Sequence, residues 1–181
     1  AYRLACQALA SDSTLTSAEG LVGEYLWRQA HDDQVAGRTA QAEQKQIEAR
    51  RHLERALTLD PIESLAAFRM GWIQRQAGDR VQAEEFYRRA LAGNTAMGEA
   101  RINLANLLME TRRLPEAISN YEIARSQGFE NPTMLVNYGV ALIQSGQNDQ
   151  AAAMWERALE LHPDPQTAEG IRRNLQRLRG Q

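Results

Sequence analysis

A period of 34 residues constrains this chain more than any other feature of its sequence. Small residues recur at that spacing in three columns, and an aromatic residue recurs in a fourth, with no insertion between copies. A fixed period of this length is typical of stacked structural repeats, in which each copy is one supersecondary unit. The four columns are Gly71, Ala105 and Gly139; Ala83, Ala117 and Ala151; Tyr87, Tyr121 and Trp155; and Ala90, Ala124 and Ala158.

Each copy reads as a helix, a tight turn and a second helix. Gly78 falls where the first helix must end and suits a left-handed C-terminal cap, while Asp79 suits the N-cap of the second helix. Gly146 holds the same place in the last copy, and Pro115 falls in the first turn of a second helix, where its missing N–H costs nothing. Ala, Leu, Gln, Glu and Arg dominate the composition, which also favours an all-α fold.

Gly71 lies inside a predicted helix, where glycine costs about 1 kcal/mol relative to alanine. The column that contains it holds only small residues, and so do two columns of the second helix. We therefore expect the two helix backbones of each copy to approach closely at these positions, with Tyr87 or its equivalent filling the volume beside the contact. Packing then offsets the propensity cost.

The pattern resembles the tetratricopeptide repeat family. The first half of its motif is matched in "FRMGWIQ", "INLANLL" and "VNYGVAL", and the second half in "AEEFYRRAL", "AISNYEIA" and "AAAMWERALELHP", with the late proline at Pro163. The leading tryptophan of the motif is replaced by Ala67, Arg101 and Leu135. The resemblance implies a right-handed superhelical α-solenoid, with repeats at 64–97, 98–131 and 132–165.

A degenerate repeat with an elongated helix is expected upstream, at 17–63. Subtracting 34 from the columns gives Gly37, Ala49, Leu53 and Ala56, but the first half of this copy is too polar for an ordinary first helix. A longer helix from Ser17 to about Ala36 fits better, opened by a capping box from Thr16 to Glu19. Residues 1–16 are expected to form an N-terminal helical segment and a polar linker. The predicted buried stripe of the long helix is Leu21, Val22, Tyr25 and Leu26, with Trp27 as a further candidate.

The last segment, 166–181, is predicted to be a capping helix that stops at Gly180. A terminal helix must cover the exposed core face of the last repeat and present a polar face to water. The apolar residues at helical spacing are Ala168, Ile171, Leu175 and Leu178, and arginines occupy the other positions.

The sequence shows no catalytic constellation, and we expect no enzyme activity, cofactor or metal site. His31, His52 and His162 are far apart, and one cysteine, Cys6, cannot build a cysteine cluster. The motifs HExxH, GxSxG and the P-loop are absent. Neighbouring Asp32 and Asp33 are expected on a solvated helix face or at the end of the elongated helix, and not as paired catalytic carboxylates.

Charge and hydropathy argue against nucleic acid and against a membrane span in this sequence. The net charge is -2 with no large basic stripe, and no apolar run approaches the roughly 20 residues that span a bilayer. The chain begins at Ala1, so we expect a processed or excised part of a longer protein. A membrane connection would then come from upstream sequence or from a membrane-protein partner. The unpaired cysteine slightly favours the cytoplasm over the periplasm.

The resemblance implies a concave groove that is lined by the first helices and holds a partner's peptide or helix. Two columns stand out, an apolar one that contains Phe68 and a second that contains Trp72. The bland alternatives are that Phe68 and Trp72 pack between repeats or under residues 1–30, and that Asn103 and Asn137 bond between repeats. The complete candidate set is Leu65, Phe68, Arg69, Trp72, Arg75, Ile102, Asn103, Asn106, Met109, Val136, Asn137 and Val140.

The leading functional hypothesis is a non-catalytic scaffold or adaptor that binds a protein segment. The Arg-rich composition, with Lys45 as the single lysine, suggests a GC-rich bacterial gene and argues against clamping of acidic C-terminal tails. Family analogy favours a larger bacterial assembly, such as an envelope, secretion or polysaccharide-export machine. Two alternatives remain open. One is self-association, with the groove receiving another copy's helix around Tyr25 and Trp27; the other is an accessory domain of a larger enzyme.

Overall fold

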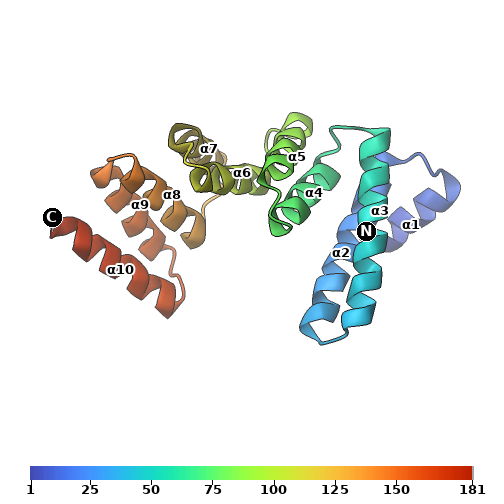
Figure 1. The fold of residues 1–181 in the computed structure, drawn as a ribbon, viewed down its shortest axis with the longest axis horizontal. Helices are drawn as coiled ribbons and strands as arrows, with labels where there is room; N and C mark the ends of the chain where they lie inside the picture. The colour runs from blue at the N-terminus through green and yellow to red at the C-terminus, as the bar shows by residue number, and fades with distance from the viewer. Residues whose placement is uncertain (181) are drawn as a thin grey trace. The chain divides into compact units, whose positions relative to one another are not determined.

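The computed structural model of this chain describes residues 1–180, and within that range every regular element is an α-helix (Figure 1). The prediction of an all-α fold is therefore confirmed. The helices fall into two compact units, residues 1–100 and residues 101–180, with α6 beginning in the first and continuing into the second. The helices are α1 (Tyr2–Ser11), α2 (Thr16–Val35), α3 (Thr39–Leu59), α4 (Ser64–Gln76), α5 (Arg80–Gly93), α6 (Gly98–Glu110), α7 (Leu114–Ser126), α8 (Pro132–Gln144), α9 (Asn148–Glu160) and α10 (Pro165–Arg179).

The predicted close approach of paired helices is present in both units. A Cβ added to Gly71 would lie 2.7 Å from the ring atom Cδ1 of Tyr87, so α4 and α5 touch at that point. In the second unit, Gly139 meets the indole of Trp155 in the same way, and a Cβ there would collide with the ring. Tyr87 is fully buried, which agrees with a structural role for the aromatic column. The alanines of the columns are buried as well.

The turns between paired helices share one hydrogen-bonding pattern. At Gly78, φ is 84°, and the N–H of the following Asp79 donates to the carbonyl of Gln74. This is the arrangement of a Schellman cap, for which glycine is favoured because left-handed backbone strains other residues. The predicted cap at Gly78 is confirmed, as is the N-cap at Asp79, whose side chain accepts from the N–H of Gln82.

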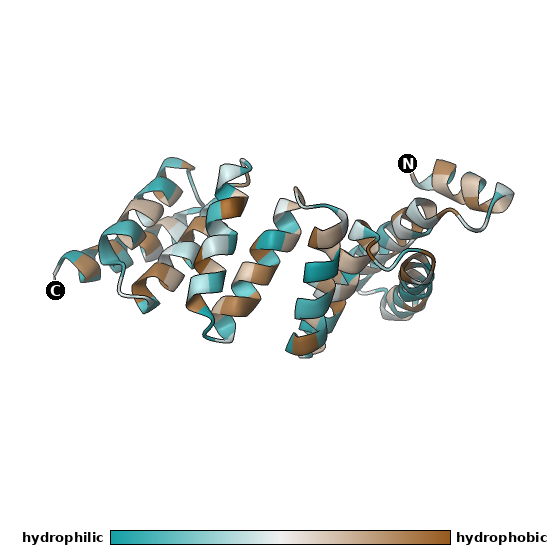
Figure 2. Cartoon of the chain, turned by 90° about the horizontal axis from the view of Figure 1, so that it is seen from above, coloured by the Kyte–Doolittle hydropathy of each residue, from teal (hydrophilic) through white to brown (hydrophobic). Residues whose placement is uncertain are grey.

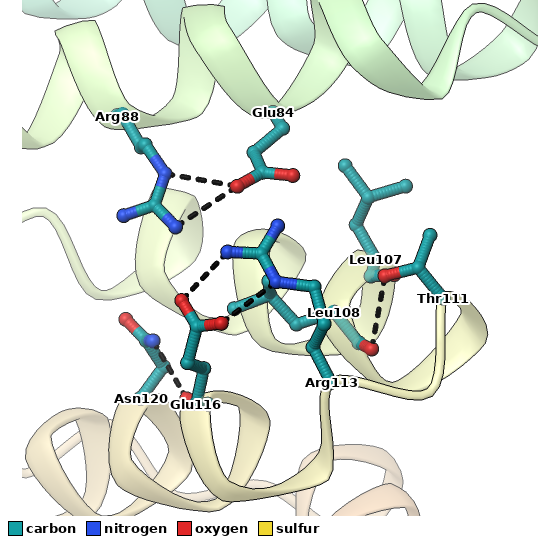
Figure 3. Close-up of polar contacts among 8 residues, drawn as sticks. All are labelled: Glu84, Arg88, Leu107, Leu108, Thr111, Arg113, Glu116 and Asn120. Atoms are coloured by element: carbon teal, nitrogen blue, oxygen red, sulfur yellow. Dashed lines mark hydrogen bonds and ion pairs between the residues drawn. The ribbon is translucent and has the colours of Figure 1, made fainter.

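The turn between α6 and α7 keeps the same geometry without a glycine. Arg112 has a φ of 63°, and the N–H of Arg113 donates to the carbonyl of Leu108. The Thr111 hydroxyl also donates to that carbonyl, at 3.1 Å, and Arg113 forms an ion pair with Glu116 one turn into α7 (Figure 3). Side-chain bonds on both sides of Arg112 therefore help to hold a backbone conformation that its own side chain disfavours.

The first helical pair differs from the prediction, because the glycine at the helix contact is Gly23 and not Gly37. A Cβ on Gly23 would lie 2.7 Å from Cγ of Leu53, which matches the contact of Gly71 with Tyr87. Gly37 instead has a φ of 74° and forms the turn, as Gly78 does. Subtracting 34 failed in the first helix because this pair carries extra residues.

Those extra residues lengthen both helices equally, at the turn end. Helix α2 has 20 residues where α4 has 13, and α3 has 21 where α5 has 14, so each is seven residues longer. Both turns carry an alanine followed by a left-handed glycine, which places the additions at 29–35 and 39–45. We call these two segments the added turns. Seven residues make almost two helical turns, so the added turns leave the contact faces unrotated.

The start of α2 differs from the predicted capping box. The N-cap is Leu15, and no side chain caps the helix. Glu19 is buried, and its carboxylate instead bonds His52 at 2.5 Å and Arg55 at 2.8 Å, both on α3. The carboxylate joins the two helices, so it cannot turn back to the helix start.

The buried stripe of α2 is narrower than the sequence suggests. Val22 and Leu26 are buried, as predicted, but Leu21 and Tyr25 are exposed by 42% and 39%. The ring of Tyr25 stacks on Tyr2 of α1, with 3.9 Å between ring centroids. A short N-terminal helix therefore packs on α2 at the position where the prediction placed core residues.

The second unit ends with α10, which packs on α9. Ala168, Ile171 and Leu175 are buried, and the arginines of α10 are exposed, as expected for a capping helix. Apolar and polar residues alternate along the helices in the way that one-sided burial requires (Figure 2). Within residues 1–180, no helix combines the length and the apolar character that crossing a membrane would need. The ranges 64–97, 98–131 and 132–165 each hold one helical pair, and we keep them as proposed repeats.

Candidate partner-binding site

A pocket of about 550 Å³ lies in the first unit between the α2–α3 hairpin and α4. We call it the hairpin pocket. Its size falls in the range of pockets that bind small molecules or side chains. Three helices contribute to its lining, which consists of Trp27, His31 and Gln34 from α2, Glu43, Gln46, Ile47 and Arg50 from α3, and Trp72, Ile73 and Gln76 from α4.

The hairpin pocket follows from the mismatch in helix length. Helix α4 packs against both α2 and α3 but ends at Gln76, while the hairpin continues through the added turns (Figure 1). His31, Gln34 and Glu43 belong to the added turns and form part of the pocket wall. A hairpin with the lengths of α4 and α5 would lack these three residues.

Aromatic and aliphatic side chains provide the apolar part of the lining. The rings of Trp27 and Trp72 meet edge to face, with 4.5 Å between their centroids. The imidazole of His31 lies nearly parallel to the indole of Trp27, at 6.1 Å. Ile47, which is exposed by 63%, adds an accessible aliphatic side chain to this lining.

The polar part of the lining is rich in unused hydrogen-bonding groups. Gln34, Gln46, Gln76 and Glu43 are exposed, and no hydrogen bond or ion pair of their side chains is recorded among the described residues. Arg50 has a long ion pair to Glu54, at 3.6 Å, and both partners are largely exposed. A ligand could therefore form hydrogen bonds with these groups without breaking any hydrogen bond within the protein.

Behind the pocket, a buried ion pair fixes α4 against α2. The guanidinium of Arg69 donates twice to the carboxylate of Glu24, at 2.6 Å each, and its carbon lies 4.2 Å from the ring centroid of Trp27. Arg69 is only 8% exposed. The sequence placed Arg69 beside a ligand, but the structure gives its charge an internal partner, because α2 presents a buried carboxylate at that point.

The other predicted residues of α4 are divided between packing and surface. Trp72 lines the hairpin pocket, so the structure joins it to residues that the sequence did not single out. Phe68 packs against a core cluster with its ring 6.3 Å from that of Tyr87, which agrees with the packing alternative. Leu65 and Arg75 are half-buried and do not line the pocket.

In the second unit, the predicted asparagines bond to one another across α6 and α8. The amide of Asn137 donates to the carbonyl oxygen of Asn106 at 3.0 Å, and the hydroxyl of Tyr121 donates to the same oxygen at 2.5 Å. The alternative of a hydrogen bond between repeats is thus confirmed for Asn137. The remaining predicted residues of this unit are all half-buried: Ile102, Asn103, Met109, Val136 and Val140.

A smaller pocket of about 350 Å³ lies in the second unit among α7, α8 and α9, and the sequence gave no sign of it. Tyr138 lines it and donates to Glu122 at 3.2 Å. Burial and the nearby Glu122 carboxylate raise the pKa of Tyr138 to about 12. The phenol is therefore a neutral hydrogen-bonding group at any physiological pH.

Sequence reasoning missed most of the hairpin pocket. It predicted Trp72 but considered Trp27 only as a core residue or for self-association, and it assigned no role to the glutamines. One signal was available, since the Ala-Gly pair at Ala36 and Gly37 repeats at Ala77 and Gly78 and marks equivalent turns. Within residues 1–180, no group of three or more His, Cys, Asp or Glu side chains is placed to hold a metal ion.

Comparison with known proteins identifies the class. Two tetratricopeptide repeat family models match residues 74–119 and 102–164, which together span 91 of the 181 residues. The chain belongs to the tetratricopeptide repeat family, and its fold is the α-solenoid of that family.

Among individual proteins, the chain is similar to the photosystem I assembly protein Ycf3 of Prochlorococcus marinus (strain NATL2A). The two are 27% identical over 118 residues, which cover 56% of this chain and 68% of Ycf3.

Solved structures share the fold. Pseudomonas aeruginosa PilF aligns with a TM-score of 0.74 and 23% identity, over 96% of this chain and 71% of PilF. YrrB, described as a tetratricopeptide repeat protein with an unusual peptide-binding site, aligns with a TM-score of 0.61 and 18% identity, over 96% of this chain and 100% of YrrB. MamA aligns with a TM-score of 0.62 and 21% identity, over 88% of this chain and 80% of MamA.

Proposed function

We propose that this protein is a non-catalytic scaffold that binds a segment of a partner protein in the hairpin pocket. The observation that carries the proposal is the composition of that pocket. Two tryptophans and two isoleucines provide apolar area, and three exposed glutamine amides line the same pocket. Recognition of a polypeptide needs this combination, because its main chain requires hydrogen bonds while its side chains supply apolar contact.

The relatives support an assembly role in this proposal. Ycf3 is named as an assembly protein, and YrrB is described as having a peptide-binding site. Tetratricopeptide repeats are in general non-catalytic interaction modules. We accordingly propose that the bound segment belongs to a component of a larger complex. Family analogy favours an envelope, secretion or polysaccharide-export machine as that complex.

The face of α6 and α8 in the second unit is a proposed additional contact surface. Ile102, Met109, Val136 and Val140 keep part of their apolar surface in solvent. The bond between Asn106 and Asn137 leaves the Asn106 amide nitrogen free of any recorded partner among the described residues. We propose that this face contacts an apolar stretch of a partner independently of the hairpin pocket.

Self-association through residues around Tyr25 and Trp27 has less support. The ring of Tyr25 is stacked on Tyr2, and that of Trp27 contacts Trp72 and Arg69, all within one chain. Helix α2 would have to give up these contacts before it could enter another copy's groove. We expect light scattering after size exclusion to report a monomer, and a concentration-dependent dimer would reopen this alternative.

The scaffold proposal is tested by capture of partners from the native organism with three matched proteins. Ile47→Glu places a charge in the hairpin pocket at a residue that is 63% exposed, so the fold should tolerate it. Val81→Glu makes the same change on α5 at a residue that is 77% exposed and lies outside the pocket. We expect a protein retained by the wild type and by Val81→Glu to be lost with Ile47→Glu. Equal retention by all three would place the function elsewhere on the molecule.

A further inference from the structure

We propose that the hairpin pocket selects one uncharged apolar side chain from an extended polypeptide, and that the added turns are the element that makes this selection possible. The inference rests on the proposed scaffold function and specifies the chemistry of the bound segment. The added turns are residues 29–35 and 39–45, which supply three of the ten lining residues.

The charges of the lining point to an uncharged occupant. Apart from the imidazole of His31, the pocket carries one carboxylate, Glu43, and one guanidinium, Arg50, so its fixed charges balance. A charged side chain entering the pocket would lose hydration without meeting a surplus of opposite charge. An apolar side chain would gain the contact area of Trp27, Trp72 and Ile47 without that cost.

The glutamines point to a polypeptide backbone. Each primary amide presents both a donor and an acceptor, which complements a peptide group with its N–H and carbonyl. Gln34, Gln46 and Gln76 come from three different helices and line the pocket together with the apolar side chains. An extended segment leaves its main-chain groups unpaired, whereas a helical segment would already have used them.

The added turns are held rigidly enough to act as a wall. Asp33 is buried and bonds Lys45 at 2.6 Å and Arg38 at 2.7 Å, which joins the two added turns across the hairpin. Ala30 and Ala42 are fully buried between them. A wall that is already ordered costs little conformational entropy when a ligand binds, which favours selection of one shape of side chain.

The direct test uses capped tripeptides Ac-Ala-X-Ala-NH2, with X as Leu, Phe, Lys or Glu, added to 15N-labelled protein. The three tryptophan indole N–H signals report on the outcome. Trp27 and Trp72 line the pocket, whereas Trp155 donates to the carbonyl of Val136 in the second unit and serves as an internal control. At peptide concentrations on the order of 10 mM, we expect Leu and Phe to shift the two pocket signals, with apparent affinities at least tenfold above those of Lys and Glu.

Two variants establish which residues are responsible. Deletion of 29–35 together with 39–45 leaves the turn at Ala36 and Gly37 and gives the hairpin the lengths of α4 and α5. We expect this variant to keep its helical circular dichroism and to lose the Leu and Phe shifts. Ile47→Glu should lose them in the full-length chain, and Val81→Glu should retain them.

The outcomes separate this inference from the scaffold proposal. Charged peptides that bind as tightly as Leu and Phe, a shift at Trp155 alone, or no saturable shift with any peptide would overturn the inference. Retention of Leu binding by Ile47→Glu would overturn it as well. If Ile47→Glu nevertheless loses a native partner, the scaffold proposal stands and only the assigned side-chain class fails. Should the deletion variant not fold, the Ile47→Glu and Val81→Glu comparison decides.

Discussion

At the scale of single residues, the structure shows where the repeat pattern carries strain. Gly37, Gly78 and Gly146 take left-handed backbone in equivalent turns, and Arg112 must take it at the fourth. For a residue other than glycine, this conformation costs roughly 1–2 kcal/mol. Glycine avoids the strain, but it also raises the conformational entropy of the unfolded chain, which offsets part of the gain in stability.

Arg112→Gly is therefore expected to stabilise the second unit by about 0.5–1 kcal/mol. The reason is relief of the left-handed strain, since no contact of the Arg112 side chain is recorded among the described residues. The free energy of unfolding from urea titrations measures the effect. Gly78→Ala in the first unit is the matched opposite change and should destabilise. A lower midpoint for Arg112→Gly would show that the turn depends on the arginine side chain.

Ala117 tests the predicted helix contact of the middle repeat. The residue is fully buried on α7, so Ala117→Leu should overpack the interior and cost roughly 1–3 kcal/mol of stability. Ser119→Leu, at an exposed position of the same helix, is the control and should change the melting temperature little. An unchanged thermal melt for Ala117→Leu would refute the repeat register on which the fold prediction depends.

At the scale of helices, buried ion pairs hold α2 in place in the first unit. The carboxylates of Glu19, Glu24 and Asp33 are all buried, and each forms an ion pair with an arginine or lysine of another helix. A helix with this polar content would not be recognised as a core element from its apolar residues alone. This explains why the sequence predicted the existence of α2 correctly but its buried face only in part.

Removing Arg69 should be costly, because the buried Glu24 carboxylate then keeps only the exposed Arg28 as an ion-pair partner. Arg69→Ala is expected to lower the stability of the first unit by roughly 3 kcal/mol, the lower end of the range for a buried pair that loses one partner. The double variant Arg69→Met with Glu24→Leu removes both charges and should recover much of the loss. Denaturant titrations of the single and double variants measure the coupling. Additive losses in the double variant would mean that the pair is not coupled as the geometry indicates.

Acidification should weaken the hairpin tip. Hydrogen bonds from Lys45 and Arg38 hold the pKa of Asp33 below its ordinary value of 3.8. A carboxyl group whose pKa is lowered by folding stabilises the protein above the unfolded-state pKa, and this contribution is lost as the pH falls through the folded-state value. The melting temperature should therefore fall less between pH 7 and pH 3 for Asp33→Asn than for the wild type, because the variant already lacks this contribution at pH 7. An equal decline in both proteins would assign the acid sensitivity to other groups.

At the scale of the whole chain, the period of 34 residues predicted the fold class, the paired helices and three turns, and the helical spacing of apolar residues predicted the last helix. It did so because the glycine and alanine columns report a backbone contact that few residue types permit. The hairpin pocket could not be predicted in the same way. Its residues come from three helices and from a pair of insertions, and its polar side chains carry no periodic signal. Trp72 alone of the pocket was identified as a binding residue, and Arg69 was misassigned because its buried partner lies 45 positions away along the chain.

The seven-residue step of the added turns limits how such a protein can change length during evolution. A gain of three or five residues in one helix would rotate everything beyond it and turn apolar side chains toward water. Insertions of seven residues in both helices next to the turn lengthen a hairpin and leave the contacts between its helices at the other end in place. Length at the turn end can therefore vary in steps of seven residues, and the spacing between a contact glycine and a turn glycine, as between Gly23 and Gly37, lets such steps be counted in the sequences of relatives.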